Sequence, residues 1–138
     1  MSESSSGARD ELAARTDAIE EAYEFFLGYA SQGLPSESGG QIRHYLQRLE
    51  TALIGLADFF TAHIAGRQLD RTAYRAFIDV IDRDAQSALA AVRMVLAQPS
   101  INSQIIDNLN ASIHVRALLT DIFLIDEILR GQPSPTEN

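Results

Sequence analysis

The sequence contains no cysteine and no lysine, and these two absences exclude several kinds of chemistry. A chain without cysteine forms no disulfide and supplies no thiolate for catalysis, a zinc site or an iron–sulfur cluster. A chain without lysine has no amine for Schiff-base formation and no phosphate-binding lysine of the kind that kinases use. All 11 basic residues are therefore arginine.

Long apolar runs are also missing. No run approaches the roughly 20 residues that a membrane-spanning helix needs, and the first 15 residues lack the basic and apolar parts of a secretory leader. Acidic residues outnumber basic ones by 19 to 11, for a formal charge of −8. An acidic surface repels nucleic-acid backbones and anionic lipids. We therefore expect a cytoplasmic protein that binds neither nucleic acid nor a membrane.

Four long segments show the apolar spacing of amphipathic helices, and no segment shows strand-like alternation. They span residues 9–32, 41–65, 70–98 and 101–131 and are separated by joints that contain glycine or proline. Asp70 and Ser100 stand where helix N-caps are expected. A chain of 138 residues is long enough for one domain. The sequence predicts an all-α fold, an antiparallel four-helix bundle over residues 9–131, with disordered residues at 1–8 and 132–138.

Helical bundles often hold metal ions, but the inward faces here offer no set of ligands. A di-iron bundle needs inward glutamates and Glu-x-x-His motifs, whereas none of His44, His63 and His114 has a glutamate three positions before it. His63 could ligate haem or accept a phosphoryl group, but a structural role at the edge of the core is the preferred interpretation. No serine or threonine is paired with a histidine and a carboxylate. We predict no metal, no cofactor and no enzymatic activity.

One polar constellation lies on the last predicted helix. Asn108, Ser112 and Arg116 follow one another at i,i+4 spacing, beside the apolar stripe, and Asp84 or Glu50 could pair with the arginine. One interpretation is a buried network that fixes the register of the helices. The other is a small pocket in which these three residues bind an anionic ligand.

Two surfaces are expected to contact other proteins. Residues 118–129 are apolar on nearly every side, so we expect them to need cover from a second chain. Phe25 and Tyr29 form an aromatic pair outside the core stripe of their helix, which could serve as a contact surface or pack under the joint at residues 33–40. The predicted interface on the last helix consists of Leu118, Ile122, Ile125, Ile128 and Leu129.

These features together favour a non-enzymatic protein that acts through protein–protein contacts, as an assembly factor, adaptor or regulator. We expect a homodimer or a complex with another protein. The alternative function is that of a ligand-binding sensor with its pocket around Arg116.

Overall fold

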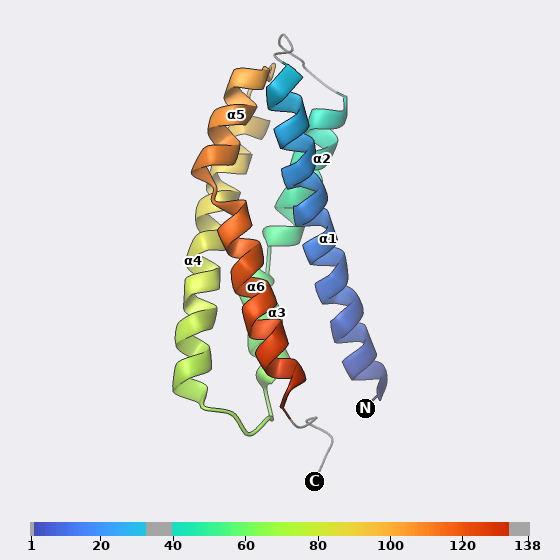
Figure 1. Cartoon of the computed structure of the whole chain (residues 1–138), viewed down its shortest axis with the longest axis vertical. Coiled ribbons are helices and arrows are strands. Elements are labelled where there is room, and N and C mark those ends of the chain that lie inside the picture. The colour runs from blue at the N-terminus through green and yellow to red at the C-terminus, as the bar shows by residue number, and fades with distance from the viewer. Residues whose placement is uncertain (1, 33–39, 133–138) are drawn as a thin grey trace.

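The computed structural model describes residues 2–32 and 40–132, and these residues form helices and connecting turns without any strand. The all-α bundle predicted from the sequence is confirmed (Figure 1). The helices are α1 (Ser2–Gln32), α2 (Gln41–Leu53), α3 (Leu56–Ile64), α4 (Arg71–Leu96), α5 (Ser103–Ser112) and α6 (Val115–Arg130). Helix α1 begins at Ser2, ahead of the predicted start at residue 9. Residues 133–138, most of the predicted tail, lie outside the described residues.

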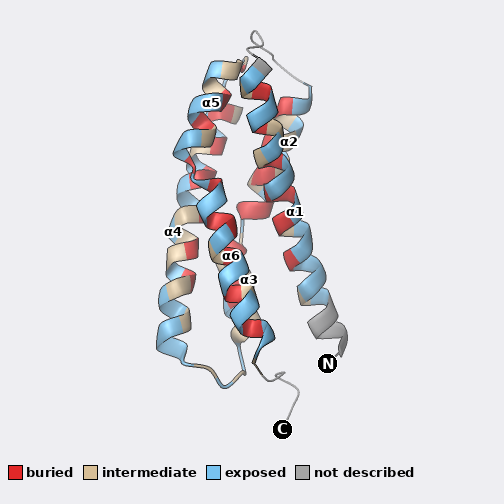
Figure 2. Cartoon of the chain, viewed as in Figure 1, coloured by how far each residue is buried: buried red, intermediate tan, exposed pale blue. Residues whose placement is uncertain are grey.

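The helices form four columns around one core. In Figure 1 the chain rises along α1, descends along α2 and α3, rises along α4 and descends along α5 and α6. Helix α1 packs against α2, α5 and α6, and α4 packs against α2, α3, α5 and α6. Buried residues gather on the sides of the helices that face one another (Figure 2), with Phe26 and Phe60 among the largest fully buried side chains.

Two segments that the sequence predicts as continuous helices are broken. The segment 41–65 is interrupted at Ile54 and Gly55, and Gly55 adopts left-handed backbone angles (φ 76°, ψ 12°). The segment 101–131 is interrupted at His114, which is left-handed as well (φ 50°, ψ 40°). Glycine adopts this conformation without strain, whereas histidine does so rarely. The apolar spacing continues through both breaks, which is why it predicts uninterrupted helices.

Of the two helix N-caps expected from the sequence, Asp70 and Ser100, only Asp70 is confirmed. The side chain of Asp70 accepts a hydrogen bond from the backbone N–H of Ala73 at 3.1 Å, as predicted. Ser100 does not cap the next helix. Asn102 takes that role, because its side-chain oxygen accepts from the N–H of Ile105 at 2.8 Å and α5 begins after it.

Three arginines donate to carbonyls at the C-terminal ends of helices in other columns. Arg15 of α1 donates to the carbonyls of Ala52 and Ile54 at the end of α2, each at 2.8 Å. Arg43 of α2 donates to Leu96 O at 3.0 Å and to Gln98 O, at the end of α4. Arg67, which follows α3, donates to Leu129 O at 3.1 Å, near the end of α6. The last carbonyls of a helix have no partner within it, so these contacts satisfy them and join the columns.

Two glycine substitutions test the break between α2 and α3. Gly55→Ala should lower the free energy of unfolding by about 1–2 kcal/mol, because a Cβ is unfavourable at positive φ. Space is not the cause, since the nearest atom to that Cβ is an Arg15 nitrogen at 3.6 Å. Gly28→Ala, in the interior of α1 where a Cβ meets nothing within 4 Å, should instead raise the free energy of unfolding by up to about 1 kcal/mol. Urea unfolding of both variants checks this, and effects of the same sign would contradict the left-handed break.

Candidate functional site

The polar constellation predicted on the last helix does not form a pocket. Asn108, Ser112 and Arg116 are all exposed, and the Ser112 hydroxyl donates to the backbone of its own helix, at Leu109 O. The prediction of a buried or half-buried network around Arg116 is wrong.

The error has a simple geometric cause. On the α5 part of this segment Ile101, Ile106, Leu109 and Ile113 are buried, whereas Ile105 is only half-buried. Successive residues of a continuous helix are about 100° apart. The left-handed turn at His114 interrupts this rotation between Ser112 on α5 and Arg116 on α6, so the i,i+4 spacing does not carry through to Arg116.

The expected partners of Arg116 are engaged elsewhere. Glu50 on α2 accepts from Arg93 on α4 at 3.0 Å. The carboxyl group of Asp84 on α4 lies close enough to that of Asp121 on α6 to add to the effect of burial in raising the pKa of Asp121.

Most of the predicted interface on α6 lies inside the chain's own core. Four of its five residues are buried, because α6 packs against α1 and α4. These four are Leu118, Ile122, Ile125 and Leu129. Ile128 differs from them, since it is 44% exposed. These four residues are therefore covered by the chain itself and are not available to a second chain, whereas Ile128 is.

The aromatic pair on α1 also packs within the chain. The Phe25 ring stacks on the Tyr45 ring of α2 with 4.3 Å between centroids. Tyr29 is buried, and its hydroxyl donates to Ile101 O at 3.2 Å. These two residues join α1 to its neighbours and do not form a free contact surface.

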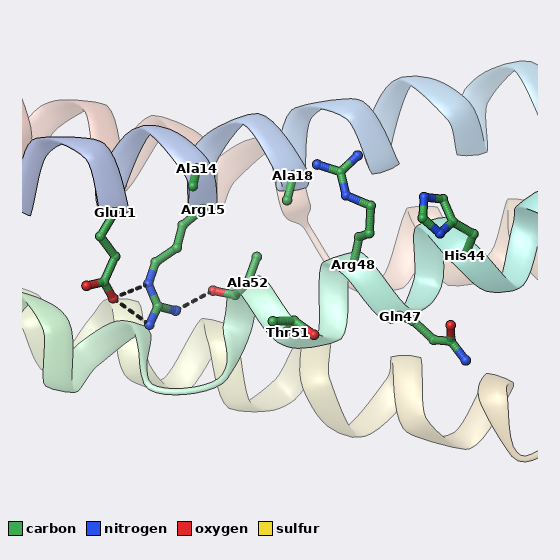
Figure 3. Close-up of a pocket in the computed structure, with 9 residues that line it drawn as sticks. All are labelled: Glu11, Ala14, Arg15, Ala18, His44, Gln47, Arg48, Thr51 and Ala52. Carbon is green, nitrogen blue, oxygen red and sulfur yellow. Dashed lines mark hydrogen bonds and ion pairs between the residues drawn. The ribbon is translucent and has the colours of Figure 1, made fainter. Parts of the chain in front are cut away.

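A groove of about 490 Å³ runs between α1 and α2 (Figure 3). Small residues line its middle, with Ala14 and Ala18 projecting from α1 toward α2. Its two arginines both have partners, since Arg48 pairs with Glu21 and Arg15 pairs with Glu11 at 2.9 Å. The groove is therefore a seam in which charged side chains join two helices.

Arg15 connects more elements than any other side chain in this seam. Besides its bonds to Glu11 and to the end of α2, its guanidinium lies 5.9 Å from the centre of the Phe59 ring on α3. The ring of His63 also stacks on Phe59, with 5.6 Å between the ring centroids. Burial lowers the pKa of His63, and the charge of Arg67 lowers it further. His63 thus lies at the edge of the core, packed against an aromatic ring.

The exposed side of α6 is where large apolar side chains gather. Phe123 is 45% exposed, Leu124 is 51% exposed, and Ile128 follows Leu124 at i,i+4 spacing. We call this side the α6 outer face, and its residues are Arg116, Ala117, Thr120, Phe123, Leu124, Glu127 and Ile128. Figure 2 shows exposed residues along α6 on the side turned to the viewer.

The sequence pattern contained a signal for this face. The apolar stretch 118–129 exceeds what one core-facing stripe requires, so some of its members had to remain outside. Which members are exposed depends on the rotation of α6 about its axis, and the turn at His114 contributes to that rotation. The spacing alone does not fix it.

A pair of carboxyl groups lies where α4 meets α6. Burial raises the pKa of Asp121, and the charge of Asp84 together with the hydrogen bond between the two groups raises it further. The pKa in the folded state is therefore above the value of the unfolded chain. The pair therefore lowers the free energy of unfolding at neutral pH, and this penalty disappears as the pH falls through the raised pKa of Asp121.

No protein-family model, curated protein or solved structure matches this chain. Among residues 2–32 and 40–132, no helix has both the length and the apolar character to cross a membrane.

The carboxyl pair gives a pH-dependent prediction. Asp121→Asn should raise the free energy of unfolding at pH 7 by about 0.2–0.5 kcal/mol, the size expected for removing one like-charged pair. The gain should shrink as the pH falls through the raised pKa of Asp121, because protonation then relieves the repulsion in the unsubstituted protein as well. Urea unfolding at several pH values measures both effects. Asp107→Asn, at an exposed position of α5, serves as the control, and the same gain there would contradict the pairing.

Proposed function

We propose that this chain acts through protein–protein contacts made by the α6 outer face, and that it catalyses no reaction itself. The observation that carries the proposal is the clustering of Phe123, Leu124 and Ile128 on one side of one helix. Single exposed apolar residues are common on proteins, whereas adjacent ones on a single face are typical of contact surfaces. Among residues 2–32 and 40–132, the other large exposed apolar residues are Leu27, Ile54 and Met94, which belong to separate parts of the fold.

The character of the face supports contact with a helix of a second protein chain. Its apolar residues lie along the length of α6, and charged residues stand near both ends, at Arg116 and Glu127. An apolar strip with a charged rim matches the usual composition of a helix-binding surface. Such a surface suits an assembly factor, adaptor or regulator in the cytoplasm, which is the role that we propose.

Photo-crosslinking in cells tests this proposal directly. A photoreactive phenylalanine analogue at position 123 should form one discrete crosslinked product, and Leu124→Glu in the same chain should remove it. The second change places a charge in the apolar strip while leaving the fold intact, because Leu124 is half exposed.

The matched control places the same photoreactive residue at Met94, which is 65% exposed on α4. A position outside the contact surface should give no discrete product. Equal products from positions 94 and 123, or a product at 123 that survives Leu124→Glu, would contradict the proposed surface.

A further inference from the structure

The charges on the α6 outer face stand at the wrong ends of their own helix. Arg116 is the second residue of α6, and Glu127 lies in its last turn. A helix carries partial positive charge at its N-terminus and partial negative charge at its C-terminus, so each of these side chains is disfavoured where it stands. Neither side chain forms a hydrogen bond or ion pair with any residue that the structure describes.

The sizes of the side chains on this face are equally uneven. The N-terminal half carries the small residues Ala117 and Thr120, and the C-terminal half carries Phe123, Leu124 and Ile128. The hydroxyl of Thr120 already donates to Arg116 O at 3.0 Å, so it needs no further partner. One half of the face is therefore shallow and the other protrudes.

We propose that the occupant of the α6 outer face is a second copy of this chain, with the two α6 helices packed antiparallel about a two-fold axis. This inference rests on the proposed function and names its partner. Arg116 and Glu127 are about three turns apart and so lie on the same side of the helix. An axis midway between them brings Arg116 of each copy to Glu127 of the other.

The same axis also matches large side chains of one copy with small side chains of the other. It places Leu124 and Ile128 of each copy over Ala117 and Thr120 of the other, so that protruding residues meet shallow ones twice. A two-fold interface must be self-complementary in this way. The axis also brings Arg116 to the negative end of the second helix and Glu127 to its positive end, which offsets their unfavourable positions in the monomer.

A parallel arrangement of the two copies lacks these matches. It would set Arg116 beside Arg116 and Glu127 beside Glu127, and like charges across an interface oppose association. It would also set the protruding residues against each other. The pattern on the face therefore selects the antiparallel pair.

Charge reversal with sedimentation equilibrium tests the pairing. Across a concentration series the unsubstituted protein should show a monomer–dimer equilibrium. Arg116→Glu and Glu127→Arg should each raise the dissociation constant at least about tenfold, because each places like charges opposite one another twice. The double variant, which exchanges the two charges, should return to within a few-fold of the original value. Both substitutions suit the dipole of α6, so the monomers should remain folded.

The controls separate this inference from the proposed function. Asp79→Arg, at an exposed site on α4, changes net charge as Glu127→Arg does and should leave the dissociation constant unchanged. A protein that is monomeric throughout overturns the self-pairing, while the crosslinking at position 123 decides separately whether another protein uses the face. A dimer that Leu124→Ser weakens but the charge reversals do not overturns the antiparallel geometry alone. A dimer unaffected by all these changes uses another surface and overturns the self-pairing, and the crosslinking at position 123 again decides the proposed function separately.

Discussion

Hydrogen bonds from arginine side chains to helix-end carbonyls connect the columns of this bundle. The break at Gly55 ends α2 within the bundle, and its last carbonyls need donors from outside the helix. Arg15 supplies two of these bonds from α1 and is itself held by Glu11 one turn earlier. Arg43 and Arg67 perform the same task for α4 and α6. A guanidinium suits this role because its planar fork can donate to two carbonyls at once, which an ammonium does less well.

The need to satisfy these carbonyls relates the helix breaks at Gly55 and His114 to the α6 outer face. A bundle of uninterrupted helices has no carbonyls to satisfy in its middle, whereas this chain breaks two of its columns. Arg15 keeps α1 fixed to the end of α2 and to the Phe59 ring of α3. The turn at His114 starts α6 as a separate helix, with Leu118, Ile122 and Ile125 inward. Phe123 and Leu124 are then left outside, and these are the residues on which the proposed function depends.

The fold class could be predicted from the sequence because the fold class depends on apolar spacing that repeats along each helix. The spacing of apolar residues over about 25 residues per segment indicates a column of helix regardless of any single position. The breaks depend on single residues. Gly55 lies within an unbroken apolar pattern, and a left-handed histidine has no clear signal in the sequence. The absence of lysine was informative as well, but only the structure shows that several arginines act as caps.

The candidate site was harder to predict, for a related reason. Whether Arg116 is buried depends on the rotation of α6 about its axis, and the turn at His114 sets that rotation independently of the preceding apolar stripe. The same rotation decides which members of the apolar stretch 118–129 form the surface. Four of the five residues expected at the interface are in the core. The face that we propose instead lies on the exposed side of the same helix.

The free energy of unfolding of Arg15→Met tests most directly whether the Arg15 contacts hold this arrangement together. The substitution keeps an unbranched apolar side chain but removes the donors to Ala52 O and Ile54 O. Relative to Arg83→Met, at an exposed position of α4, we predict a loss of about 1.5–3 kcal/mol, the range for hydrogen bonds that involve a charged group. Equal free energies of unfolding for the two variants would contradict the account, because the broken columns would then be held together without Arg15.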